Sequence, residues 1–253
     1  MIRQRRVDAF MDNVFKKRRS VLVALLMAFF IILGFSPSVD SPSVAELSGT
    51  LDVDVLSDSV QKYDGELASD VLSRIDIKGR ASKTGYSRDE FGSGWASIDG
   101  CDTRNIILGE SLIDAKVSDD DCTVLNGTLN DPYTGVVIEF TRGRSSSSDV
   151  QIDHVVALSD AWQKGAQQLD FPDRVVFAND PLNLLAVDGP ANQQKGDSDA
   201  ASWLPDNKVF RCRYVARQIA IKDKYSLWMT AAENAAIRRV LNGCGDQVVP
   251  LEE

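Results

Sequence analysis

Apolar residues recur at regular helical and strand spacings from about residue 64 onward. Leu67, Val71, Leu72 and Ile75 fall at positions i, i+4, i+5 and i+8, on one face of a short helix. A stretch rich in glycine and aromatic residues follows at residues 85–95. The first predicted element of the folded region is therefore a helix.

The middle of the chain alternates short apolar runs with turn-forming residues. Apolar runs with β-branched residues, bounded by such turns, predict three short strands, at residues 135–141, 150–154 and 183–187. Residues 157–169 have helical composition. The Asp-Gly-Pro sequence at 188–190 predicts a turn, with a helix from about Ala191.

The C-terminal part is predicted to be helical. Residues 209–220 carry Val215 and Ile219 on one face. The run from Thr230 to Glu233 fits a capping box that opens a second helix, ending near Leu241. The fold class is thus α+β, a small antiparallel sheet within a mostly helical domain.

The N-terminal segment has the pattern of an export signal. Seven Lys and Arg precede an unbroken apolar run at residues 21–35, and a Ser/Pro-rich stretch follows. We interpret residues 1–45 as a signal peptide or an uncleaved membrane anchor, and expect membrane contact only through residues 21–35. Residues 46–63 are predicted to be a flexible linker, 64–245 the folded domain and 246–253 a tail.

The charge balance argues against tight, non-specific binding of nucleic acid. Residues 46–253 hold 21 Lys and Arg against 34 Asp and Glu, a net charge of −13. Such binding depends on releasing counterions to basic side chains. Residues 195–239, however, hold nine basic and five acidic side chains, so one face of the domain could still be basic.

Four cysteines lie beyond the leader, at 101, 122, 212 and 244, and none forms a Cys-x-x-Cys pair. A zinc knuckle is therefore poorly supported, whereas an even count in an exported chain predicts two disulfides. Three pairings are possible. We favour the two sequence-local ones, Cys101–Cys122 and Cys212–Cys244, each stabilising by about 3–4 kcal/mol.

The single histidine, His154, follows Asp153 at the end of a predicted strand. Imidazole has an ordinary pKa near neutrality, which makes histidine the usual general base. Asn183 opens the next strand, and Asn192 and Lys195 begin the helix after it. Simpler roles are a turn cap for Asp153, a turn residue for Asn183, a helix N-cap for Asn192 and a solvated surface charge for Lys195.

The order Asp-His, Asn and Asn resembles the HNH endonucleases of the ββα-metal superfamily. The sequence around these residues is similar to that of an exported bacterial branch of the family. This branch shares its domain with the C-terminal part of GmrSD-type modification-dependent restriction enzymes. The matching stretches are 152–162, 183–185 and 192–197, with further marks at 101–105 and 131–135. The resemblance covers residues 64–245 and implies a ββα-metal core within that domain.

The resemblance implies a role for each motif residue. His154 would be the general base, Asp153 and Asn192 would bind a divalent metal, and Asn183 would orient the His154 loop or ring. Carboxylate and carboxamide oxygens suit Mg²⁺, with Mn²⁺ as an alternative, better than Zn²⁺. The side chains expected to contact substrate phosphates are Lys195, Arg104 and Arg144. Many HNH proteins carry a further histidine or zinc-binding cysteines, which this chain lacks.

Two functions are weighed on these grounds, and a third, a toxin-like effector against competing cells, has no specific support in the sequence. The first is an exported, metal-dependent endonuclease that acts on DNA, with RNA as an alternative substrate. The second is a catalytically silent cell-envelope binding module on the same scaffold, favoured by the acidic exported surface and by the flexible linker at residues 46–63. A Ser-His-Asp hydrolase is disfavoured because the chain has no Gly-x-Ser-x-Gly elbow.

Overall fold

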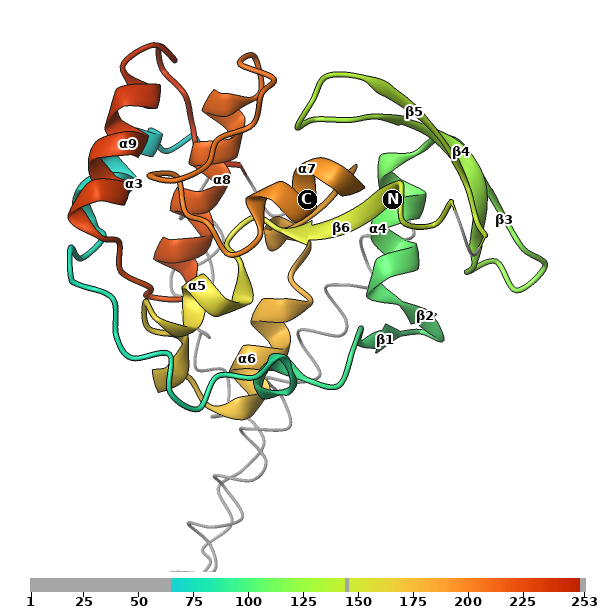
Figure 1. Ribbon diagram of the computed structural model, residues 1–253, viewed down its shortest axis with the longest axis horizontal. Helices are drawn as coiled ribbons and strands as arrows, with labels where there is room; N and C mark the ends of the chain where they lie inside the picture. Colours follow the sequence, from blue (N-terminus) through green and yellow to red (C-terminus); the bar gives the residue numbers. More distant parts are fainter. Residues whose placement is uncertain (1–64, 144–145, 251–253) are drawn as a thin grey trace, which may run out of the picture. The chain divides into compact units, whose positions relative to one another are not determined.

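The computed structural model describes residues 65–143 and 146–250 (Figure 1). The predicted leader, the linker and Arg144 lie outside these residues. The elements follow in the order α3 (Ala68–Arg74), η2 (Arg88–Phe91), β1 (Ser97–Ile98), β2 (Cys101–Asp102), α4 (Thr103–Ser111), β3 (Ile113–Val117), β4 (Val124–Asn130), β5 (Val137–Thr141), β6 (Val150–His154), α5 (Leu158–Trp162), η3 (Ala166–Gln168), α6 (Phe171–Ala178), η4 (Pro181–Asn183), β7 (Leu184–Asp188), α7 (Gly189–Lys195), α8 (Arg211–Lys224) and α9 (Ala231–Leu241).

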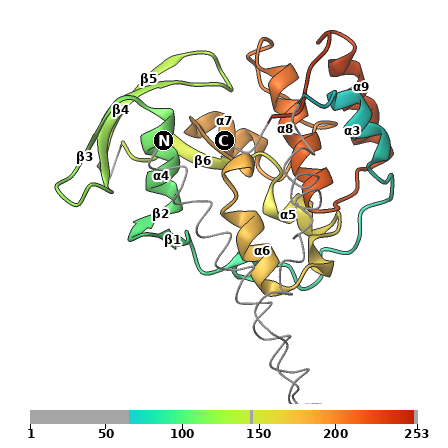
Figure 2. The same cartoon turned by 180° about the vertical axis from the view of Figure 1, so that it is seen from behind.

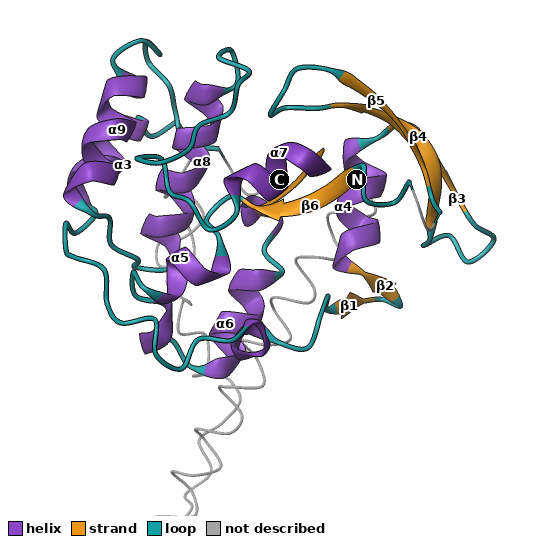
Figure 3. Ribbon diagram, viewed as in Figure 1, coloured by secondary structure: helices purple, strands orange, loops and turns teal. Residues whose placement is uncertain are grey.

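The strands form small antiparallel sheets, and the α-helices contain more of the described residues than the strands do, which confirms the α+β class (Figure 3). β3, β4 and β5 make a three-stranded sheet, β1 pairs with β2, and β6 pairs with β7. In the β6–β7 pair, Val150 lies opposite Asp188 and His154 opposite Leu184. α7 follows β7 directly and contacts both strands. Two antiparallel strands and a helix therefore surround the Asp-His sequence.

Two hydrophobic clusters meet at the β6–β7 pair. The larger cluster joins α3, α5, α6, α8 and α9, with Tyr214 and Ile219 of α8 fully buried in it. The smaller cluster joins α4 to the β3–β5 sheet, which curves around that helix in both views (Figures 1 and 2). Because side chains alternate along a strand, β6 contributes Ile152 to the smaller cluster while Asp153 faces the other way.

A network of buried charges lies inside the larger cluster. The ammonium group of Lys164 contacts carboxylates of Asp160, Asp199 and Glu233 at 2.6–2.7 Å, and Lys222 contacts Glu233 at 2.9 Å. The side chains of both lysines are 0% exposed. Burial opposes the charge of Lys164, but attraction by Asp160 and Glu233 outweighs it and raises the pKa of Lys164. The half-exposed Arg80 adds a third cation, next to Asp160 and Asp199.

Several predicted helices have different bounds, for local reasons. The helix expected at 157–169 ends at Trp162. Gly165 then adopts a φ of 125°, and a Cβ there would lie 3.2 Å from Leu227 and Trp228. The turn predicted at 188–190 is instead the start of α7, where Asp188 is the N-cap and accepts a hydrogen bond from the Ala191 amide at 2.8 Å.

The helices and disulfides of the C-terminal half agree with the sequence. α9 opens with the predicted capping box of Thr230 and Glu233. Both favoured disulfides, Cys101–Cys122 and Cys212–Cys244, are present. The domain extends past the predicted boundary at residue 245, because Val249 is buried and its amide donates to Glu66. Within residues 65–143 and 146–250, no helix is long and apolar enough to cross a bilayer.

Candidate active site around His154

The end of β6 and the loop after it are held by Asn183. The main-chain oxygen of Asn183 accepts from the Val155 amide at 2.8 Å, and its side-chain oxygen accepts from the Val156 amide at 2.8 Å. Its Nδ2 donates to the Val156 carbonyl at 3.3 Å. Asn183 is 0% exposed and is the last residue of η4, one position before the strand it was expected to open. Its contacts therefore fix the loop that follows His154.

His154 is a buried, neutral imidazole. Its Nε2 lies 2.8 Å from the carbonyl oxygen of Ala178. A carbonyl can only accept, so Nε2 carries the proton and Nδ1 keeps its lone pair. The ring of Trp95 lies parallel to the imidazole, with planes 7° apart and centroids 5.6 Å apart. Burial lowers the pKa of His154 to about 3. The Nε2 hydrogen bond thus fixes the orientation of the ring, and Nδ1 is its basic atom.

This arrangement leads to a prediction for the free protein. Since His154 is the single histidine of the chain, its imidazole gives one unambiguous set of NMR resonances in untagged protein. Those resonances should not titrate between pH 8 and pH 4, because the pKa is lowered to about 3 by burial. A midpoint near 6.5 would show a solvated ring instead.

Asp153 is buried, and each of its carboxylate oxygens accepts a side-chain hydrogen bond. The Tyr133 hydroxyl donates to its Oδ2, and the ammonium of Lys195 donates to its Oδ1 at 2.9 Å. Burial raises the pKa of Asp153, while Lys195 and Tyr133 counteract that rise by stabilising the carboxylate. Lys195 also donates to the His154 carbonyl at 2.9 Å and is 1% exposed. Its charge is therefore paired inside the protein, neither solvated nor directed at a substrate.

A cavity of about 290 Å³ brings three of the predicted residues together. Asp153, His154 and Asn192 all line it. Asn192 lies within α7, whose N-cap is Asp188, so the N-cap alternative for Asn192 is wrong. Its Nδ2 donates to Gln151 at 2.9 Å. His154 also lines a smaller, adjoining cavity of about 100 Å³.

Comparisons with known proteins identify the family of the chain. The model of the family described as "GmrSD restriction endonucleases, C-terminal domain" matches residues 102–240, more than half of the chain. The chain belongs to this family. A protein of Arthroderma benhamiae named "Uncharacterized secreted protein" is 37% identical over 180 residues, covering 70% of this chain and 84% of that protein. No solved structure matches the chain. The bacterial branch suggested by the sequence stays a prediction.

Some residues that line the cavities lie outside the range matched by the GmrSD family. Tyr86, Arg88 and Trp95 line the two cavities but precede residue 102. They were not predicted as site residues, although the glycine-rich, aromatic stretch at 85–95 was the available signal. Arg104, which was predicted to contact phosphate, lies on α4 and donates to the Ser147 carbonyl at 3.4 Å. It lines neither cavity.

The residues at the cavity fit a hard divalent cation held by few protein ligands. Each Asp153 oxygen keeps a lone pair beyond the bonds from Lys195 and Tyr133, and Asn192 would supply its carbonyl oxygen, since its nitrogen donates to Gln151. Mg²⁺ prefers such oxygens and keeps several waters. Within the described residues, no group of three His, Cys, Asp or Glu side chains could hold a metal. Oxygen donors such as these are the type expected for Mg²⁺ or Mn²⁺ rather than for zinc.

Proposed function

We propose that this protein is an exported, metal-dependent endonuclease that hydrolyses phosphodiester bonds of DNA, with RNA as an alternative substrate. Membership of the GmrSD C-terminal domain family supports a nuclease-related activity. Export is supported by the leader pattern of residues 1–45, by the two disulfides and by the secreted relative.

The observation that carries the proposal is the state of His154. A general base must be unprotonated at working pH and must keep a free lone pair. Burial keeps the ring unprotonated, and the Ala178 carbonyl binds the Nε2 proton, which leaves Nδ1 as the basic atom of a residue that lines the cavity. The same pKa makes His154 a weak base, so the water that it deprotonates must itself be activated.

The proposed reaction uses the residues around the cavity in distinct roles. Nδ1 of His154 takes a proton from water as the water oxygen attacks phosphorus, and the bond from phosphorus to the leaving oxygen breaks. Asp153 and Asn192 are the side chains that would hold the cation. The chemistry supplied by such a cation is activation of the water and neutralisation of charge on the phosphate and leaving oxygen. Asn183 keeps the loop in place through Val155 and Val156.

A plasmid-nicking assay tests the proposal. Supercoiled DNA should be converted to open-circular and linear forms in Mg²⁺ or Mn²⁺, and EDTA should abolish the conversion, because the protein ligands alone do not neutralise the phosphate. Single-stranded RNA in the same buffers tests the alternative substrate. Adding Mg²⁺ back after EDTA should restore activity, which separates metal dependence from damage by the chelator.

An absence of cleavage with every metal between pH 5 and pH 9 would contradict the nuclease proposal. It would favour the silent binding module, in which Lys195 and Tyr133 permanently occupy Asp153. That module predicts partner binding that survives the replacement of His154.

A further inference from the structure

The segment from Gly85 to Trp95 forms one wall of the site, although it lies outside the residues matched by the family. Arg88 is shared by both cavities, as is His154. Tyr86 lines the larger cavity, and Trp95 lines the smaller one. Part of the wall beside the proposed base therefore comes from residues that precede the matched range.

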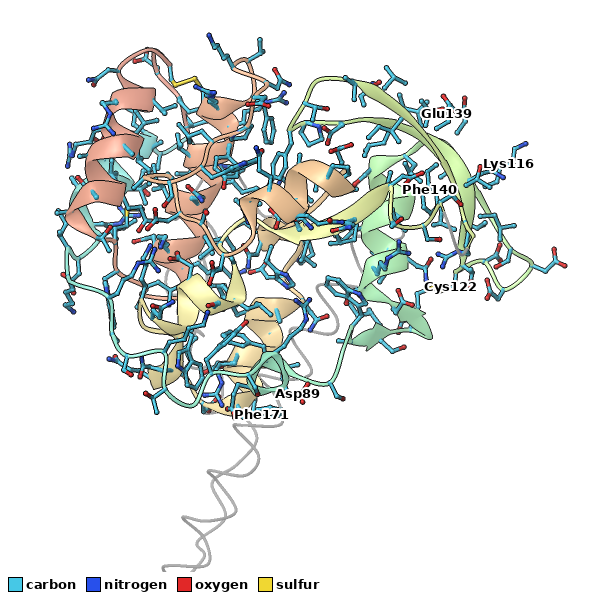
Figure 4. The ribbon with its side chains drawn as sticks, viewed as in Figure 1. Asp89, Lys116, Cys122, Glu139, Phe140 and Phe171 are labelled. Atoms are coloured by element: carbon cyan, nitrogen blue, oxygen red, sulfur yellow. A yellow bond between two sulfur atoms is a disulfide. The ribbon has the colours of Figure 1, made fainter. Side chains whose placement is uncertain are left out.

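The backbone of this wall is anchored in the core. Phe91, 1% exposed, packs against Phe177 and Trp162 with ring centroids 5.8 and 6.3 Å apart. Arg174 of α6 donates to the Glu90 carbonyl at 2.7 Å and to its carboxylate at 2.9 Å. η2 thus packs against α6, and Figure 4 labels Asp89 of η2 and Phe171 of α6. The position of Arg88 is consequently fixed at its backbone.

Arg88 is the cation at the cavity whose charge is not already paired. Lys195 is bound to Asp153, and Lys83 contacts Asp197, another cavity residue, at 3.1 Å. Arg88 is exposed and has no hydrogen-bond or ion-pair partner within residues 65–143 and 146–250. Burial of the imidazole is the main cause of the lowered pKa of His154, and the positive charge of Arg88 lowers that pKa further. An unpaired guanidinium therefore faces the space beside the imidazole.

We propose that Arg88 binds a phosphate of the nucleic-acid strand whose phosphodiester bond is attacked at His154. A guanidinium group binds phosphate through two parallel N–H donors, with geometry that a lysine cannot supply. The exported part carries a net charge of −13, so a strand needs a local cation to approach the cavity. Arg88 thus takes the role that the sequence suggested for Lys195 and Arg104. This inference rests on the proposed nuclease function.

The inference is tested by binding, in a His154→Ala background that leaves the probe uncut. Arg88→Gln and Arg88→Lys are compared with Arg239→Gln, which removes the same charge from an exposed position on α9 that lines neither cavity. The probe is a fluorescein-labelled single-stranded oligonucleotide, followed by anisotropy in Mg²⁺ over a range of salt concentrations.

Arg88→Gln should weaken binding about tenfold for every probe sequence, the loss expected for one charge-assisted contact. The slope of log affinity against log salt should fall by about 0.7. Arg88→Lys should keep the slope and recover part of the affinity. Arg239→Gln should change neither quantity, and equal melting temperatures would show that the fold is intact.

Equal affinity and slope for Arg88→Gln and its parent would overturn the inference, as would a parent that binds no oligonucleotide. Failure of the nuclease proposal is distinguishable. Wild-type protein that cuts nothing while Arg88→Gln still loses affinity and slope would leave the phosphate contact standing. Wild-type protein that cuts normally, with Arg88→Gln unchanged in binding and kcat/KM, would remove Arg88 alone.

Discussion

Replacing His154 with Ala should lower the rate of phosphodiester cleavage by about 10²–10⁴-fold, the usual contribution of a general base. The loss should appear in kcat, with little change in KM, because the imidazole acts on water rather than on the bound strand. Nδ1 of His154 is the sole imidazole lone pair in the chain, so no other histidine can compensate. Initial rates on a labelled duplex in Mg²⁺, at several substrate concentrations, measure both parameters.

A second substitution separates catalysis from folding, because His154 is buried and donates to Ala178. His154→Gln keeps an N–H donor of similar reach while removing the basic nitrogen. It should melt close to wild type and be as inactive as His154→Ala. Wild-type rates in either substitution would show that the base lies elsewhere.

The second large effect is expected in the buried charge network. Lys164→Met should destabilise the fold by about 3–5 kcal/mol, because one partner of a buried ion cluster is lost while its carboxylates stay buried. Lys164 contacts three of them, on Asp160, Asp199 and Glu233. Urea unfolding followed by far-ultraviolet circular dichroism measures the change in the free energy of unfolding.

An exposed pair provides the matched control for this prediction. Lys78 contacts Asp76 at 2.8 Å, with side chains 55% and 70% exposed, so Lys78→Met should change stability by less than about 1 kcal/mol. Adding Glu233→Gln to Lys164→Met restores the charge balance and should recover part of the loss. If Lys164→Met were as mild as Lys78→Met, the network would contribute no net stability.

Local patterns predicted the elements whose signals lie in neighbouring residues. The spacing around Val71 predicted α3, and the capping box at Thr230 predicted the start of α9. α4 and α6 were missed, although Asp102 and Asp170 cap them by accepting from the amides of Asn105 and Asp173. Each of these caps is a single aspartate, and an aspartate before a helix looks the same as one in a turn.

The site shows the same division between local and distant information. Sequence order placed Asp153 and His154 at a strand end, and the structure puts them on one cavity with Asn192. The order of residues could not show that Lys195 would form an ion pair with Asp153, since the two residues are 42 positions apart. Nor could it show that Arg88, far upstream, would reach the same cavity.

The sequence by itself determined the α+β class, the family and the identity of the candidate base, and it favoured the correct pairing of the cysteines, because each depends on residue type and short-range spacing. The tertiary structure decided which charges are available to a ligand. Packing between distant segments pairs Lys195 with Asp153 and leaves Arg88 without a partner among the residues that the structure describes. Availability depends on burial and on the nearest opposite charge, and neither is encoded in the order of residues along the chain.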